Sequence, residues 1–191
     1  MKRRTALKSI FALSFLSLTS YNFFRWFSIH RKFDPKLFLA HKNLISELAE
    51  VIIPETETPG AKSANVVQYI INVILNCTDN VQQNRFVEGL INVDNYTLRE
   101  YNTQFVKCTK IEKEQTLQYL ENRDEYNYSI LNKLNNKLFG GAFFLILKNL
   151  CVEGYCISEI GATKGLSYDY IPGRYLSCIP LSRNQKSWAT S

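Results

Sequence analysis

The spacing of apolar residues limits most strongly what this chain can fold into. Between residues 37 and 155 they recur three or four positions apart, which is the period of an α-helix that buries one face. No stretch alternates apolar and polar residues for long enough to predict a sheet. Of the 191 residues, 46% are hydrophobic and 21% are charged, so the chain can bury a core. We therefore expect a mainly α protein, a small single-domain helical bundle.

Turn residues and helix caps divide this pattern into separate helices. Asp34 followed by Pro35 is typical of a helix start, and the first helix is expected to end just before Pro54. Pro59-Gly60 marks a turn in the loop that follows, and Ser63 is the candidate cap of the second helix. Further helices are predicted from residue 79 or 80 to residue 101, over residues 110–120 and 124–138, and over residues 142–155, an apolar segment that we expect to be a core element.

The final part of the chain departs from this helical pattern. Residues 158–191 contain three glycines and two prolines among aromatic side chains. This composition is typical of loops and short turns. We therefore expect one domain over residues 34–191 that ends in a long irregular C-terminal segment.

Residues 1–27 form a leader ahead of this domain. A short basic start precedes an apolar run from Ile10 to Leu18, which is the pattern of a secretory signal. The run is shorter than the roughly 20 residues that span a bilayer comfortably. Because no Ala-x-Ala cleavage site follows, two alternatives stay open: a cleaved signal, or a retained helix that anchors the chain to the inner membrane.

The start of the leader resembles a twin-arginine export motif. Arg3 and Arg4 are followed by Leu7 and Lys8, where that motif has an apolar residue and often a lysine. Ala6 replaces the usual phenylalanine, and the alternative is a general secretory signal that contains an arginine pair by chance. The twin-arginine translocase exports folded cargo, so the motif predicts a periplasmic protein that can assemble with partners before export.

The leader also accounts for the basic character of the chain. It contains five Lys and Arg residues and no acidic residue, whereas the whole chain has a formal net charge of +6. Removing those five charges leaves +1 for residues 28–191. A nearly neutral body offers no basic face for phosphate groups, so we expect no nucleic-acid partner.

The cysteines and histidines do not form a recognisable metal or haem site. None of the five cysteines belongs to a Cys-x-x-Cys pair, and the two histidines, His30 and His41, lie far from them in the sequence. Three cysteines are candidates for a disulfide in an oxidising compartment, and the alternative is that they are buried, inert thiols. These three are Cys151, Cys156 and Cys178.

The sequence also lacks the common catalytic motifs. It contains no Gly-x-Gly-x-x-Gly segment, no phosphate-binding loop and no Gly-x-Ser-x-Gly elbow. Two weaker routes to catalysis are a carboxylate pair, Glu153 and Glu159, and a cysteine–histidine pair made from Cys151 or Cys156 with His30 or His41. We assign no catalytic, cofactor-binding or metal-binding residue to this chain.

Three segments combine glycine or proline with large side chains and are the candidate partner-binding regions. Aromatic residues among turn residues are typical of recognition surfaces, and the alternative is that they pack onto the helices and close the core. The candidate residues are Pro59 and Gly60 in the first segment, Tyr155, Ser158 and Glu159 in the second, and Tyr168, Pro172, Gly173 and Tyr175 in the third.

Together with the leader, these segments resemble the gluconate 2-dehydrogenase subunit 3 family. Four of its motifs occur here in order over most of residues 35–180. They are matched by Ile52-Ile53-Pro54 with Thr58-Pro59-Gly60-Ala61, by Phe86 with Gly89-Leu90, by Gly154-Tyr155 with Ser158-Glu159 and Gly161-Ala162, and by Tyr168-Asp169 with Pro172-Gly173 and Tyr175.

This resemblance implies a non-catalytic accessory subunit of a periplasmic or membrane-bound dehydrogenase for sugars or sugar acids. The implied partners are a flavoprotein large subunit of the glucose–methanol–choline (GMC) oxidoreductase type, which carries FAD, and a cytochrome c subunit with haem c. The small subunit would have no cofactor and would assist folding and twin-arginine export of the large one. The alternatives are a stand-alone exported helical binding protein at the membrane surface, and a small enzyme that uses Glu159 or a cysteine.

Overall fold

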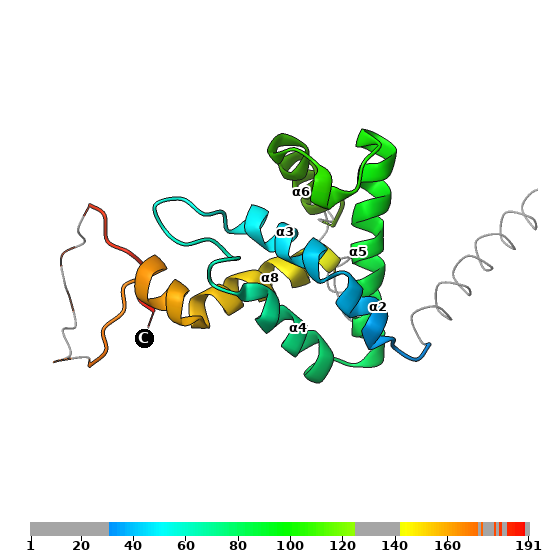
Figure 1. Ribbon diagram of the computed structural model, residues 1–191. Helices are drawn as coiled ribbons and strands as arrows, with labels where there is room; N and C mark the ends of the chain where they lie inside the picture. Colours follow the sequence, from blue (N-terminus) through cyan, green and yellow to red (C-terminus); the bar gives the residue numbers. More distant parts are fainter. Residues whose placement is uncertain are drawn as a thin grey trace, which may run out of the picture.

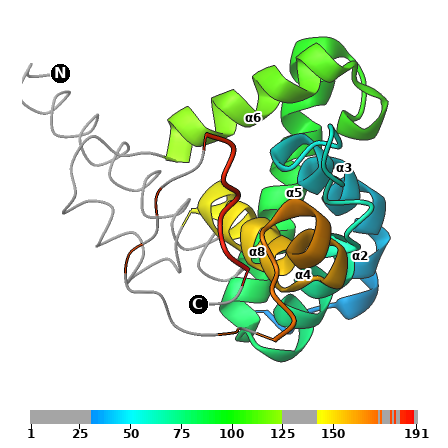
Figure 2. The ribbon, with the colours of Figure 1, turned by 90° about the vertical axis from the view of Figure 1, so that its left-hand side faces the viewer.

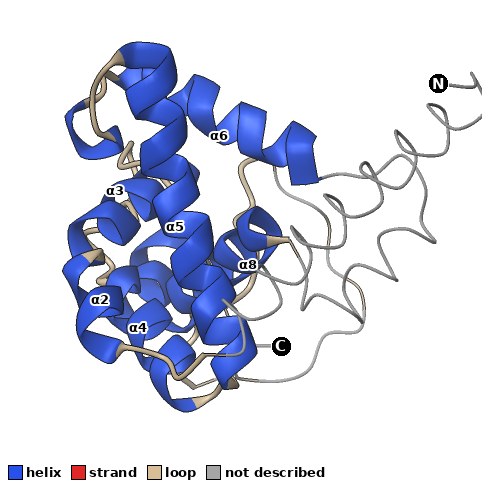
Figure 3. Cartoon of the chain, turned by 90° about the vertical axis from the view of Figure 1, so that its right-hand side faces the viewer, coloured by secondary structure: helices blue, strands red, loops and turns tan. Residues whose placement is uncertain are grey.

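A computed structural model describes residues 31–124 and 142–171, together with residues 173, 178, 180 and 183–189. The described residues are mainly helical, as predicted, and contain no strand (Figures 1 and 3). The leader and the predicted helix over 124–138, apart from its first residue, lie outside the described residues. The α-helices are α2 (Pro35–Ala40), α3 (Lys42–Ile52), α4 (Val66–Asn76), α5 (Asn80–Tyr101), α6 (Lys110–Asp124) and α8 (Phe143–Ile157), with a 3₁₀ turn η1 (Phe105–Lys107) and a π-type turn η2 (Gly161–Gly165).

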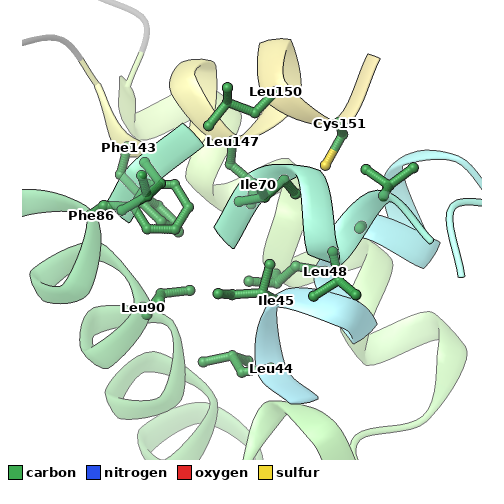
Figure 4. Close-up of a cluster of buried hydrophobic side chains, with 14 of the residues drawn as sticks. Leu44, Ile45, Leu48, Ile70, Phe86, Leu90, Phe143, Leu147, Leu150 and Cys151 are labelled. Atoms are coloured by element: carbon green, nitrogen blue, oxygen red, sulfur yellow. The ribbon is translucent and has the colours of Figure 1, made fainter. Parts of the chain in front are cut away.

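α8 lies at the centre of the domain and contacts α3, α4, α5 and α6 (Figure 2). Its prediction as a core element is confirmed, because Leu147 and Cys151 are fully buried. Figure 4 shows these side chains facing apolar residues of the neighbouring helices, among them Ile45 and Leu48 of α3 and Ile70 of α4. Burial of such side chains contributes roughly 1.5–3 kcal/mol each, so this cluster is the main source of stability.

The first predicted helix is broken in two. Asp34 caps it as expected, because its Oδ1 accepts a hydrogen bond from the backbone N–H of Lys36 at 2.9 Å. At His41 the backbone leaves helical geometry, and its N–H bonds the carbonyl oxygens of Phe38 and Leu39, three and two residues back, instead of that of Leu37. The imidazole Nδ1 lies 2.8 Å from the Leu37 carbonyl oxygen. The apolar spacing continues across this break, which explains why the pattern predicted one helix.

The cap of the second helix is also different from the prediction. Asn65, with a left-handed backbone (φ 52°), stands before α4, whereas the Ser63 hydroxyl donates to the Glu55 carboxylate at 2.7 Å. The prediction for α5 is confirmed, since the Asp79 side chain accepts a hydrogen bond from the backbone N–H of Gln82 at 2.8 Å. α5 ends at Tyr101, and its C-cap is Asn102, a residue type that tolerates the left-handed backbone found there.

The C-terminal segment begins with more regular structure than its composition predicted. Residues 159–165 form a helical turn that ends in η2, where we expected loop. After η2 the chain leaves the helices. An isolated β-bridge then pairs Ser167 with Trp188, near the C-terminus. The two backbone hydrogen bonds of this bridge, Ser167 N–H to Ser187 O and Ala189 N–H to Ser167 O, are both 2.8 Å long.

Gly89 allows α5 to approach α8. A methyl group at this position would overlap the ring of Phe143, which in turn packs edge-on against Phe86 with ring centroids 5.2 Å apart. Gly89 is itself buried, so the ring has little room to move.

We expect Gly89→Ala to lower the free energy of unfolding by about 1–3 kcal/mol, because overpacking outweighs the helix propensity gained. Thermal or denaturant unfolding followed by circular dichroism measures this change. Gly173→Ala is the control, since the space around that residue is open. An unchanged midpoint for Gly89→Ala would contradict the close approach of the two helices.

Candidate functional site

The loop between α3 and α4 is closed around the carboxylate of Glu50. Its Oε1 accepts a hydrogen bond from the Glu55 backbone N–H at 3.0 Å, and its Oε2 accepts one from the Lys62 N–H at 2.9 Å. The Ala61 N–H donates to the Ile53 carbonyl oxygen at 2.9 Å, which brings the two ends of the loop together. One side chain of α3 therefore satisfies two otherwise unpaired backbone donors in this loop.

Gly60 is required by this arrangement. A methyl group there would lie 2.6 Å from both Glu50 Oε1 and the Glu55 nitrogen, closer than atoms can pack. Ala61, the next residue, is fully buried, and Pro59 is half-buried. The structure thus explains the last two residues of the Thr-Pro-Gly-Ala motif. The glycine position has no room for a side chain, and the next position holds a small side chain that is buried.

Two ion pairs hold the same loop against the rest of the domain. Glu47 of α3 accepts from Lys62 Nζ at 2.7 Å and from Lys113 Nζ of α6 at 2.8 Å. Burial raises the pKa of the Glu47 carboxyl, but the hydrogen bonds from the two lysines more than offset it, so that the net pKa is lowered. The carboxylate therefore stays charged and links the loop to α6.

The second motif segment begins at the end of α8, where Tyr155 meets this loop. Its ring is only 8% exposed, and its hydroxyl donates to the Pro59 carbonyl oxygen at 2.8 Å, across 96 positions of sequence. Gly165 of η2 lies against the same hydroxyl, and a methyl group on Gly165 would overlap the hydroxyl oxygen. Tyr155 thus connects three segments: α8, η2 and the α3–α4 loop, which lie at one end of the molecule in Figure 1.

Ser158 turns the chain from α8 into η2. Its hydroxyl donates to the Tyr155 carbonyl oxygen at 2.8 Å and accepts from the Gly161 N–H at 2.9 Å. A methyl group on Gly161 would overlap the Tyr155 carbonyl. The Gly-Tyr-x-x-Ser-Glu-x-Gly motif therefore encodes one turn, and its remaining charged residue, Glu159, is exposed.

The third segment is different, because its described side chains are exposed. Tyr168, Tyr170 and Ile171 have 43%, 82% and 74% of their surface accessible. Ile157, at the end of α8, is 64% exposed. Gly173 is also exposed, whereas Pro172 and Tyr175 lie outside the described residues.

The structure therefore divides the predicted partner-binding residues into two groups. Pro59, Gly60, Tyr155 and Ser158 are packed together and close this end of the fold, as the alternative interpretation held. Glu159 and Tyr168 lie on the surface at the same end. Contact with a partner stays a prediction for all of these residues.

Cys151, Cys156 and Cys178 are free thiols in the structure, and a disulfide that includes Cys178 stays a prediction. Cys151 and Cys156 are five residues apart on α8, a rise of about 7.5 Å that exceeds the Cα separation of a disulfide. Burial raises the pKa of the Cys151 thiol to about 12, so at neutral pH it is protonated. Cys151 is a core residue rather than a nucleophile.

Of the other candidate catalytic groups, His30 lies outside the described residues. No hydrogen bond joins His41 to a described cysteine; its ring lies against its own helix. Burial raises the pKa of the Tyr69 hydroxyl, and the negative charge of the Glu153 carboxylate raises it further. Within residues 31–124 and 142–171, no group of three or more His, Cys, Asp and Glu side chains is placed to hold a metal ion. None of the helices described there is both long and apolar enough to cross a bilayer.

The family of the chain follows from a comparison that covers most of this domain. A family model described as gluconate 2-dehydrogenase subunit 3 matches residues 40–173. The chain belongs to the gluconate 2-dehydrogenase subunit 3 family. The match runs from the end of α2 through the α3–α4 loop, α8 and η2 to the exposed Tyr170 region, and the resemblance drawn from the motifs is thereby confirmed. No curated protein and no solved structure matches the chain.

Glu47, Glu50 and Tyr69 are the residues of this region that sequence reasoning missed. Glu47 and Glu50 lie on α3. In the sequence they look like ordinary solvent-exposed acidic residues of an amphipathic helix. Tyr69 contacts Gly154, where a methyl group would lie 2.7 Å from its ring. Only the tertiary contacts distinguish these residues from ordinary helix positions.

We expect Tyr155→Phe to lower the free energy of unfolding by about 1 kcal/mol, the usual net value of one hydrogen bond. The α3–α4 loop should lose protection most, so hydrogen exchange at the Ala61 and Lys62 amides should accelerate. Tyr168→Phe is the matched control, because Tyr168 lies on the surface, and it should leave both measurements unchanged. Equal effects of the two substitutions would contradict the connecting role of Tyr155.

Proposed function

We propose that this chain is the non-catalytic accessory subunit of a periplasmic or membrane-bound gluconate 2-dehydrogenase-like complex. Its main partner would be a flavoprotein of the GMC oxidoreductase type that oxidises a sugar or sugar acid. FAD would belong to that large subunit, and haem c to a cytochrome c subunit. The observation that carries this proposal is the family match over residues 40–173, combined with an exposed apolar surface beside the family motifs.

The proposed docking surface consists of the exposed apolar side chains at the motif end. Ile157 extends from α8, while Tyr168, Tyr170 and Ile171 follow η2. The bridge between Ser167 and Trp188 brings a further exposed aromatic residue next to Tyr168. Aromatic and aliphatic side chains that are exposed together with turn residues are the groups that supply most binding energy in protein interfaces.

The packed motif residues give this surface a fixed support. Tyr155 and Ser158 hold η2 against the α3–α4 loop, so the chain leaves the helical domain at a defined point before Tyr168. A surface that is ordered before binding loses less conformational entropy when the partner arrives. We infer that the two groups of motif residues act together, one positioning the segment and the other contacting the large subunit.

The leader supplies the proposed export function. A twin-arginine signal carries folded cargo, and Arg3, Arg4, Leu7 and Lys8 match its pattern. A large subunit without its own signal would then cross the membrane bound to this chain, and the complex would be periplasmic. If the leader is retained, it also anchors the complex to the inner membrane.

Affinity purification of the full chain from its native host tests the proposed complex. The tagged chain should bring down a flavoprotein with bound FAD, and Ile157→Glu should reduce the captured flavin at least about tenfold, as expected for loss of a buried apolar contact. Ile111→Glu on α6 is the matched control, because Ile111 is 67% exposed and lies on a different helix. A stable monomer that captures no flavoprotein would overturn the proposal in favour of a stand-alone binding protein.

Conservative substitution of the arginine pair tests the export function separately. With Arg3→Lys and Arg4→Lys together, the dehydrogenase activity of the large subunit should stay in the cytoplasm, because the translocase requires the arginine pair of this signal. Activity in periplasmic and cytoplasmic fractions is the measurement. Normal export of the activity would contradict the proposed role of the leader while leaving the complex itself intact.

A further inference from the structure

The part of the chain that follows the leader directly forms a small basic and apolar surface. We define the α2 patch as Arg31, Lys32, Lys36, Leu37, Leu39 and Lys42, all of which are exposed. None of its four cationic side chains forms a salt bridge with a residue that the structure describes. Between residues 31 and 46 the single acidic residue is Asp34, whose carboxylate caps α2.

The geometry of α2 places these side chains on the outer face of the domain. Phe38 is fully buried and packs against Phe86 with ring centroids 6.1 Å apart, so this side of α2 faces the core. Successive residues of a helix are about 100° apart, which directs Lys36 outward and sets Leu37 and Leu39 on either side of it. The patch is therefore a lysine flanked by two leucines, with further cations at both ends of α2.

The position of the patch is fixed relative to the point where the leader joins the domain. Asn84 of α5 donates from Nδ2 to the Arg31 carbonyl oxygen at 2.6 Å. The ring of Phe33 lies 5.9 Å from that of Phe38. The leader, with its apolar run from Ile10 to Leu18, precedes Arg31 in the sequence, so the chain tethers the α2 patch to whatever holds the leader.

We propose that the α2 patch lies on anionic lipid headgroups when the full chain is at the membrane. Lys and Arg side chains are attracted to the negative headgroups, and the flanking leucines can enter the boundary between headgroups and acyl chains. The long aliphatic stems of the lysines allow their charges to stay at headgroup level. This inference rests on the membrane location that is part of the proposed function.

A lipid surface fits these observations better than another macromolecule. The two leucines are only 36% and 44% exposed, so the patch offers much less apolar area than a stable protein interface buries. A nucleic acid would require a wider basic surface, and the body of the chain is nearly neutral. Four cations beside an apolar leader are complementary to an anionic bilayer.

The inference also gives the domain an orientation. Figure 1 shows α2 at one end of the domain and the α3–α4 loop with η2 at the other. If α2 faces the bilayer, the α3–α4 loop and η2 lie at the opposite end of the domain, away from the bilayer. The proposed docking surface for the large subunit then stays accessible while the subunit is attached to the membrane.

Lysine acetylation of the full chain, read by mass spectrometry, tests this contact. The chain is reconstituted with phosphatidylcholine vesicles, with or without phosphatidylglycerol, and treated with a water-soluble acetylating reagent. Lys36 and Lys42 should react about fivefold more slowly when phosphatidylglycerol is present, since each basic residue near an anionic surface gains about 1 kcal/mol. High salt should remove the protection, and the exposed Lys107 and Lys110 are the internal controls.

Equal reactivity of all four lysines in both vesicle types would overturn the inference. Protection of Lys36 and Lys42 that appears only when the dehydrogenase subunits are added, without vesicles, would assign the patch to a protein partner and would also overturn it. Lys36→Glu with Lys42→Glu should abolish the protection of Lys32, whereas Lys107→Glu with Lys110→Glu should preserve it. Capture of the flavoprotein by the chain is measured separately in detergent, without vesicles. A missing lipid contact can therefore be distinguished from a missing complex with the flavoprotein.

Discussion

The burial of α8 between four other helices determines how the remaining parts of this domain are placed. Leu147 and Cys151 are enclosed on all sides, and Phe143 contacts α5 only because Gly89 has no side chain. At the other end of the same helix, Tyr155 reaches the α3–α4 loop. The position of α8 therefore fixes both the packing of the bundle and the place where the C-terminal segment leaves it.

Much of this fold could be predicted from the sequence, because helical spacing and caps are local properties. Asp34 and Asp79 cap helices where predicted, and residues 142–155, predicted as a core element, form most of the central helix α8. The break at His41 could not be predicted, since the apolar spacing continues through it. The Ser63 prediction failed because the chain has a competing partner for that hydroxyl, the Glu55 carboxylate, which only the folded loop brings close.

The motif residues could be recognised from the sequence, but which of them are packed inside the fold and which are exposed could not. Tyr155 and Tyr168 both belong to family motifs, yet one is buried with its hydroxyl bound and the other is exposed. Burial depends on contacts across 96 positions, which no local pattern contains. The same reason explains why Glu47 and Glu50, which hold the α3–α4 loop, were not distinguished from solvated acids.

We propose that the two ends of this domain have different roles. One end lies next to the leader in the sequence and carries the α2 patch, and the other carries the motif residues Pro59, Gly60, Tyr155 and Ser158 together with exposed apolar side chains. This separation suits a protein of the gluconate 2-dehydrogenase subunit 3 family, because membrane contact and partner contact would not compete for the same surface. The core between the two ends keeps their geometry fixed.

Site-specific photo-crosslinking in the native host tests the central claim, that the motif end contacts the large subunit. A photoreactive amino acid at Tyr170 should give a covalent adduct with the flavoprotein, and the same group at Ile111 on α6 should give none. Adducts at Ile111 and none at Tyr170, or no flavoprotein adduct at either position, would contradict the account.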